Sequence, residues 1–536
     1  MSTRHGWTGT PAIRVAFQAP ATPAVGVVVC PPFGQEGVVA YRTLRHLADE
    51  LESRGIASVR YDPSGRGDSA PDDDPDAPVQ SAETAATLLR DAGCTRIVFA
   101  GLASGVLVAA AAAARSVDAD VVLWDPPASG RAWIRRQRAL ATMTIGSDRV
   151  VDGVESLLGV DLTPPAADAI AAIRMPSLPD RHVLVATRPG AVPPAGLGSV
   201  EHIEVAGTGE LLDGTSMRAR IPGGAVTAIA DWVDAVTRSA TAGAGNAPVL
   251  DDLVVPAACG EPVVVERIVS LGPDQLFGIE TAPAEAHPGL PVVLLHNGAA
   301  EHRVGAGDYQ VALARALARD GVRAVRFDRR GTGESGDVRA DESSLLFTQE
   351  WIDDQDAVIA ALGVSGGHLA IAGMCSGAWL AAHAAAAAPR LVVEISPNDY
   401  RRRPAAPGDD AEAARAVEDI TAARQWLRDR WNRWVPAPVR LRLAWRRPTG
   451  SIAGHLRRIV QAGTRTVLVV SPLDAAIFEQ LGGPDALARI GGDVEVVRVP
   501  DGDHSLFAPR MRATVIELVR HRVAAAFPAG VVEHRG

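Results

Sequence analysis

The chain has 536 residues, and its 63 acidic and 53 basic residues give a formal net charge of -10. This balance argues against general nucleic-acid binding, which usually requires a basic domain. All of the basic residues are arginine, so a mechanism through a lysine Schiff base or a lysine general base is excluded.

The two halves of the chain repeat one pattern. Residues 27–36 (VVVCPPFGQE) correspond to residues 292–301 (VVLLHNGAAE), and residues 55–69 correspond to residues 321–335. Similar segments in the same order indicate an internal duplication. Within each copy, short apolar strands alternate with amphipathic helices, as a mainly parallel sheet flanked by helices requires.

We therefore predict the α/β class, with two tandem domains at 1–240 and 241–536. The length suits two cores better than one. A stretch of glycine and small residues, RSATAGAGNAP at 238–248, is the predicted linker.

The first helix of each copy carries an apolar stripe. Leu44, Leu47 and Leu51 recur at helical spacing in the first copy, as do Tyr309 and Leu313 in the second. We expect both stripes to face the cores.

The first copy lacks the residues of a catalytic triad. Its sequence GLASG centres Ala103 between two glycines, where a nucleophile would stand. No acid follows the strand at 182–194, and Glu210 lies near the position of the base. Asp125 and Asp213 remain, and without a nucleophile or histidine we interpret them as structural. The first copy is thus a predicted pseudoenzyme domain that stabilises the second copy, shapes its entrance or holds a partner.

The second copy has the corresponding sequence GMCSG, in which Gly373 and Gly377 flank Cys375. An apolar strand precedes this segment and an alanine-rich helix follows it, which predicts a sharp turn that presents the cysteine. The start of a helix favours the thiolate form. The alternative is a buried structural cysteine at a tight turn.

An acid and a base follow in the order that such a site needs. Asp474 comes directly after one predicted strand, and His504 comes after the last one. We predict a Cys375, His504 and Asp474 triad, in which histidine is the base and aspartate orients it. Asp399 is the alternative acid. A capping role for Asp474 and a surface position for His504 are the structural alternatives.

The predicted oxyanion hole needs two backbone donors. Ser376, directly after the nucleophile, should supply one N–H, and the loop HNGAAEHR should supply the other from Ala299 or Gly298. We interpret His296 in that loop as structural.

An insertion at about 400–460 is the predicted cap. It is helical and rich in arginine, and it contains four of the ten tryptophans. Such a lid could cover an acyl chain and attract an anion at its rim. An amphipathic helix packed on the core is the alternative, and a membrane-surface helix is disfavoured by two prolines in the segment. The predicted substrate-binding residues are His302, Trp379, Trp426 and Trp431.

The ordered motifs HNG, DRRGTGES, GMCSG, SPLD and GDHS are together similar to the signature of the α/β-hydrolase superfamily, and the resemblance covers both halves. The CSGA elbow and the CPPFGQE segment also resemble the paired hydrolases that accompany exosortase systems. The cysteine is similar to that of dienelactone-hydrolase-like members. This resemblance implies two α/β-hydrolase-like domains, the first degenerate and the second catalytic with a helical cap.

The predicted function is acyl transfer through a cysteine acyl-enzyme, by a thioesterase or acyltransferase that acts on carrier-protein or coenzyme A thioesters. Ester or lactone hydrolysis is the near alternative, and a non-catalytic didomain scaffold or acyl-binding protein is the alternative of another class. We expect no metal, cofactor or nucleic-acid partner. The four cysteines are expected to be reduced, and the absence of a leader pattern and of a long apolar window predicts a cytoplasmic protein without a membrane span.

Overall fold

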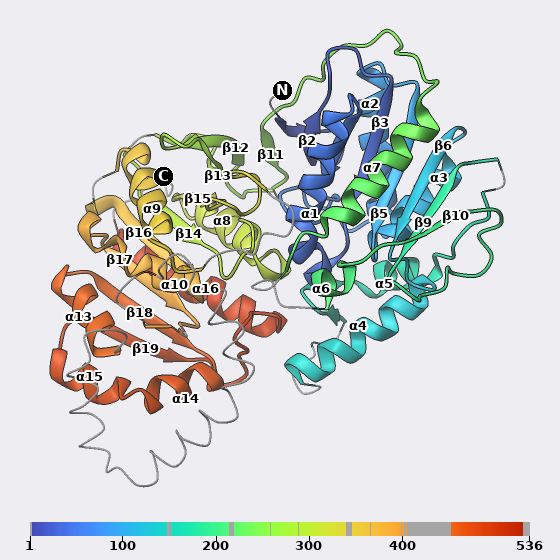
Figure 1. Ribbon diagram of the computed structural model, residues 1–536. Coiled ribbons are helices and arrows are strands. Elements are labelled where there is room, and N and C mark those ends of the chain that lie inside the picture. Colours follow the sequence, from blue (N-terminus) through green and yellow to red (C-terminus); the bar gives the residue numbers. More distant parts are fainter. Residues whose placement is uncertain are drawn as a thin grey trace.

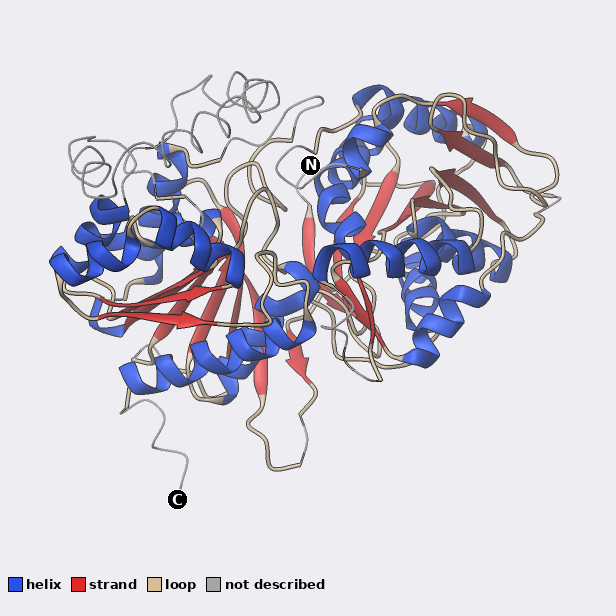
Figure 2. Cartoon of the chain, turned by 90° about the horizontal axis from the view of Figure 1, so that it is seen from below, coloured by secondary structure: helices blue, strands red, loops and turns tan. Residues whose placement is uncertain are grey.

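The computed structural model describes residues 3–146, 151, 153–178, 180–213, 219–257, 259–287, 289–338, 346–364, 366–397, 399–400, 404 and 452–528. Most of the predicted cap, with Trp426 and Trp431, lies outside these residues. We call the chain up to residue 240 the N-terminal half and the remainder the C-terminal half. Each half contains a sheet between layers of helices, which confirms the predicted α/β class (Figures 1 and 2).

The N-terminal half holds an eight-stranded sheet, in which β1–β2 and β2–β4 are antiparallel and all other neighbours are parallel. In spatial order the strands are β1 (Arg4–Thr8), β2 (Ile13–Gln18), β4 (Ala57–Tyr61), β3 (Val25–Cys30), β5 (Arg96–Leu102), β6 (Ala119–Trp124), β9 (Val183–Thr187) and β10 (Glu201–Glu204). A separate hairpin joins β7 (Glu155–Leu157) to β8 (Val160–Leu162).

The C-terminal half holds a nine-stranded sheet. In spatial order it contains β11 (Leu253–Val255), β12 (Val264–Leu271), β13 (Leu276–Pro283), β15 (Arg323–Phe327), β14 (Val292–His296), β16 (Leu369–Met374), β17 (Leu391–Ile395), β18 (Arg465–Val470) and β19 (Val494–Arg498). Pairing is antiparallel from β11 to β15 and parallel from β15 to β19. Apart from the added edge strand β11, both sheets have the same strand order and directions.

Helices cover both faces of each sheet, because successive strand residues point to opposite sides. In the N-terminal half, Val28 packs in the cluster with α2 and α3, whereas Val27 and Val29 pack in the cluster with α1 and α7. The helices of this half are α1 (Gly34–Ser53), α2 (Ala77–Asp91), α3 (Gly105–Arg115), α4 (Gly130–Ile145), α5 (Pro164–Ala172), α6 (Thr208–Leu212) and α7 (Gly223–Thr237).

In the C-terminal half, α8 and α16 pack on one face of the sheet, and α9 and α10 pack on the other. The α-helices are α8 (Tyr309–Arg319), α9 (Gln349–Leu362), α10 (Ser376–Ala381), α13 (Ile452–Gln461), α14 (Pro472–Gln480), α15 (Gly483–Ile490) and α16 (Pro509–Ala526). Short 3-10 turns span Ala306–Asp308, Gly366–His368 and Ala384–Ala387. The predicted helix stripes are confirmed, since Leu44, Leu47, Leu51, Tyr309 and Leu313 are all buried.

The two halves contact each other through the antiparallel ends of their sheets. Trp7 in β1 pairs with Asp251, two residues before β11, and its ring lies in a cluster with Phe277 and Ile279 of β13. The loops that follow β4 and β15 meet at the same interface (Figure 1). Among the described residues, no helix combines the length and apolar character needed to cross a membrane.

Candidate active site

Cys375 occupies a sharp turn between β16 and α10. Its backbone has φ 52° and ψ -114°, a conformation that is rare for a residue with a side chain. A Cβ atom on Gly373 would lie 2.1 Å from the Gly377 carbonyl oxygen, and one on Gly377 would lie 2.6 Å from the Asn297 carbonyl oxygen. The glycines therefore allow the strand, the helix and the loop after β14 to converge on Cys375.

Asp474 and His504 lie side by side next to this turn. The His504 Nδ1 atom is 2.7 Å from Asp474 Oδ1. Asp474 is buried at the start of α14, where its other carboxylate oxygen accepts a hydrogen bond of 2.6 Å from the Ser471 hydroxyl. The same carboxylate thus contacts both the first turn of α14 and the histidine ring.

The environment stabilises the charged form of both groups. Burial opposes ionisation of Asp474, but hydrogen bonds from His504 and Ser471 outweigh it and hold its pKa below the usual range. Burial also opposes protonation of His504, but hydrogen bonds to Asp474 and to the Cys375 sulfur outweigh it and raise its pKa to about 10. His504 therefore contacts both other members of the predicted triad, and these contacts favour its protonated form.

The loop after β14 lies against the cysteine. A Cβ atom on Gly298 would be 3.3 Å from the Cys375 Cβ atom. The Gly298 N–H, however, donates to the Asn297 side chain at 3.0 Å. Within the described chain, the N–H groups of Ala299 and Ser376 donate no hydrogen bond. Of the predicted oxyanion-hole donors, these two therefore have no hydrogen-bond partner among the described residues, whereas the Gly298 N–H has one.

Arg329 contacts the backbone of this loop, and no sequence pattern had singled it out. Its guanidinium donates to the carbonyl oxygens of Asn297 at 2.8 Å and Ala299 at 2.5 Å, and it lies 3.9 Å from the centre of the Trp351 ring. Arg330, the next residue, instead extends toward solvent. The sequence DRRG does not distinguish the two arginines, because burial is decided by the turn that follows β15.

The predicted substrate-binding residues that the structure describes, His302 and Trp379, are buried. His302 is buried at the interface between the halves, where its ring stacks on Tyr41 at 4.2 Å, and burial lowers its pKa to about 4. Trp379 is buried in α10 in a cluster with Trp351 and Leu380. Neither placement tests a role in substrate binding, which stays a prediction. His296 is buried against Phe327, as expected of a structural residue.

The corresponding turn of the N-terminal half has a different environment. Ala103 has φ 49°, close to that of Cys375, but its methyl group offers no nucleophile. The Ser104 hydroxyl beside it donates to Glu36 at 2.7 Å, and Glu36 also accepts a hydrogen bond from Trp133. These polar groups satisfy one another at the place that corresponds to the loop after β14 in the C-terminal half.

Ion pairs lie at the ends of two other strands of this half, β6 and β9. Arg188, which follows β9, contacts Asp125 at 2.8 Å and also contacts Asp213. Glu210 is exposed on α6. Asp125 and Asp213 therefore form structural ion pairs, in agreement with their predicted role. Among the described residues, no group of three His, Cys, Asp or Glu side chains could hold a metal ion.

Comparison with known proteins finds a similarity in the C-terminal half. Residues 292–518, which contain Cys375, Asp474 and His504, match the model of the alpha/beta hydrolase family. A search of curated proteins found no match.

A search of solved structures matches a serine hydrolase without a lid from Xanthomonas campestris, with 20% identity over 51% of this chain and 99% of that chain, and a TM-score of 0.30. The thioesterase domain from the curacin biosynthetic pathway has 17% identity over 47% of this chain and 98% of that chain, with a TM-score of 0.29. Mouse alpha/beta hydrolase domain-containing protein 10 has 14% identity over 52% of this chain and 99% of that chain, with a TM-score of 0.30. Within residues 292–518, the chain is similar to the alpha/beta hydrolase family.

Proposed function

We propose that the protein is an acyl-transfer enzyme that works through a Cys375 thioester intermediate. The observation that carries this proposal is the position of His504 between Asp474 and the Cys375 sulfur, at a turn bordered by two backbone N–H groups that have no hydrogen-bond partner among the described residues. An imidazolium in contact with a thiol favours the thiolate, which is the nucleophilic form.

The proposed first step forms the acyl-enzyme. The Cys375 thiolate attacks the carbonyl carbon of a thioester or ester, and the carbonyl electron pair moves to oxygen. The N–H groups of Ala299 and Ser376 hold the resulting oxyanion. Collapse of the intermediate restores the carbonyl and expels the thiolate or alkoxide, which takes a proton from His504.

The second step transfers the acyl group. Neutral His504 accepts a proton from water, an alcohol or an amine as this acceptor attacks the acyl carbon, and the Cys375 thiolate leaves. Exchange of one thioester for another costs little free energy, so a cysteine favours thioester substrates. Coenzyme A and acyl-carrier proteins are the proposed donors, and the N-terminal half is a pseudoenzyme domain derived by duplication.

Intact mass spectrometry tests the first step. The protein is incubated with a panel of acyl thioesters and activated esters, and an acyl adduct on Cys375 is expected. The experiment uses a Cys259→Ala background, because Cys259 is an exposed thiol that could react without catalysis. The matched variant Cys375→Ala in this background should remain unmodified. An unmodified parent protein, or equal labelling of the Cys375→Ala variant, would favour the scaffold alternative.

A second comparison addresses the choice of cysteine. Cys375→Ser should keep the fold and shift the products toward hydrolysis, because an oxygen ester is a less activated acyl donor than a thioester. Identical ratios of hydrolysis to transfer in the two proteins would favour plain ester or lactone hydrolysis as the activity.

A further inference from the structure

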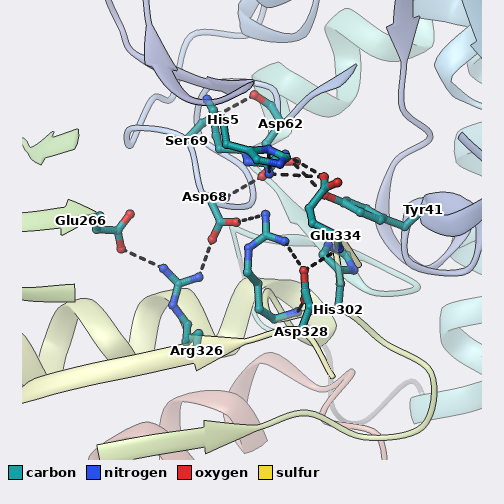
Figure 3. A network of polar contacts seen from close by, with 12 residues as sticks. His5, Tyr41, Asp62, Asp68, Ser69, Glu266, His302, Arg326, Asp328 and Glu334 are labelled. Atoms are coloured by element: carbon teal, nitrogen blue, oxygen red, sulfur yellow. Dashed lines mark hydrogen bonds and ion pairs between the residues drawn. The ribbon is translucent and has the colours of Figure 1, made fainter. Parts of the chain in front are cut away.

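At the interface between the halves, each half places one buried carboxylate against an arginine of the other half (Figure 3). Asp68 follows β4 in the N-terminal half and contacts Arg326 in β15 of the C-terminal half. Glu334 follows β15 and contacts Arg60 in β4 at 2.8 Å through both carboxylate oxygens. The two carboxylates occupy equivalent positions in the repeated segments, as do the two arginines. Each half therefore inserts an acid into the other.

The Asp68 side of this exchange reaches the oxyanion loop, which we define as residues 297–303. The second oxygen of Asp68 lies 2.7 Å from the Arg303 guanidinium, and the side chains of Asp68, Arg303 and Arg326 are all 0% exposed. Burial opposes ionisation of Asp68, but the charges of Arg303 and Arg326 outweigh it and hold its pKa below the usual range. Asp68 is thus an anion that the N-terminal half supplies to the C-terminal half.

Arg303 connects this anion to the end of the oxyanion loop. Its backbone N–H and its guanidinium donate to the two oxygens of Asp328, at 2.8 Å and 2.7 Å. The Asn297 side chain, at the start of the loop, donates to the carbonyl oxygen of His302. The loop is therefore held at both ends, and a buried guanidinium between Asp68 and Asp328 needs both carboxylates to balance its charge.

The Glu334 side of the exchange reaches the oxyanion loop only indirectly, through Tyr41, which stacks on His302, and through its backbone N–H, which donates to Asp328. The side-chain partners of Glu334 are Arg14, Tyr41 and Arg60, all in the N-terminal half. Glu334 and Asp68 thus make equivalent ion pairs across one interface, but only Asp68 contacts the oxyanion loop.

We propose that Asp68 is a positioning residue for the oxyanion loop, so that the pseudoenzyme half completes the active site of the other half through the Asp68–Arg303 contact. This inference rests on the proposed function. It assigns to the N-terminal half a specific task in the acylation step, because the Ala299 N–H must meet the oxyanion in a fixed place.

The test compares Asp68→Asn with Glu334→Gln in the full-length chain. Both substitutions preserve size and remove one buried negative charge from the same interface. Acylation of Cys375 by a thioester depends on the oxyanion loop, whereas its alkylation by iodoacetamide depends on the thiolate alone. Hydrogen exchange of a peptide that covers residues 296–304 reports the order of the loop without any need for activity.

Asp68→Asn is expected to slow acylation by about 10- to 100-fold and to leave alkylation within about twofold of the parent rate. It should also speed amide exchange in residues 296–304, whereas Glu334→Gln should change each of these quantities much less, because its side chain pairs with no residue of the loop. If Asp68→Asn does not fold, Arg303→Lys serves as the second variant, because lysine keeps the charge but cannot span both carboxylates. Arg303→Lys should also slow acylation selectively and speed exchange.

Equal slowing by Asp68→Asn and Glu334→Gln would overturn the inference, since it would indicate a general effect of the interface. Parent-like acylation and exchange in both Asp68→Asn and Arg303→Lys would also overturn it. Absence of acylation in the parent protein refutes the proposed function instead, and the exchange measurement then decides alone whether Asp68 orders the loop.

Discussion

Arg329→Gln should separate activity from stability at the oxyanion loop. The guanidinium is buried and donates to the carbonyl oxygens of Asn297 and Ala299. Glutamine has one amide group and can replace one of these hydrogen bonds at most. The substitution therefore releases one end of the contact that holds the loop beside Cys375, while it leaves the triad residues unchanged.

The effect on stability should be small because two contributions oppose each other. Burial lowers the pKa of Arg329 to about 10, so the charged side chain costs roughly 3 kcal/mol more in the protein than in water. Loss of one charge-assisted hydrogen bond costs about 1.5–3 kcal/mol, and loss of the contact with Trp351 costs about 1 kcal/mol. We expect the free energy of unfolding to change by no more than about 2 kcal/mol.

The effect on catalysis should be larger. A misplaced oxyanion donor slows acylation by about 10- to 100-fold. Urea unfolding followed by tryptophan fluorescence measures stability, and the rate of thioester acylation measures catalysis. Arg330→Gln is the matched control, because Arg330 is 42% exposed and pairs with Asp274 and Asp354. It should cost about 1 kcal/mol and leave the acylation rate unchanged.

Two results would refute this reasoning. Parent-like acylation by Arg329→Gln would show that the two carbonyl contacts do not position the loop. A stability loss above about 4 kcal/mol would show that Arg329 is chiefly a structural residue, since intact contacts would then outweigh the cost of its burial.

Three further predictions concern the same site. Gly377→Ala should slow acylation at least about tenfold, because its Cβ atom would overlap the Asn297 carbonyl oxygen and displace the loop; parent-like acylation kinetics would contradict this. Asp474→Asn should lower the pKa of His504 and slow iodoacetamide alkylation at pH 7, and an unchanged rate would show that the carboxylate is not needed for the ion pair. The pKa of His302 is about 4 in the folded protein and near 6.5 in the unfolded chain, so the unfolded chain binds a proton first as the pH falls. This difference should lower the free energy of unfolding by about 2 kcal/mol between pH 7 and pH 5. His302→Gln should lose correspondingly less stability over this range, and an equal loss in the variant would disprove the prediction.

Local sequence patterns determined the class of fold and the order of the candidate site residues along the chain. Leu44, Leu47 and Leu51 recur at helical spacing, and the spacing within a single helix is enough to predict that its apolar side faces the core, where these residues are buried. The glycines around Cys375 predict its turn because they are four residues apart on one segment. Asp474 and His504 were predictable because each follows a strand of a parallel sheet, whose strand ends meet along one edge.

Tertiary structure alone decided which neighbouring residues act together. Arg329 and Arg330 are the same residue type in adjacent positions, and only the path of the loop after β15 buries the first beneath the oxyanion loop. The Gly298 N–H is engaged by a side chain whose rotamer no pattern specifies. Asp68 lies more than 200 residues from Arg303, and their contact depends on how two separate sheets pack. Such pairings follow from packing between elements, which periodicity and motif spacing within one segment do not encode.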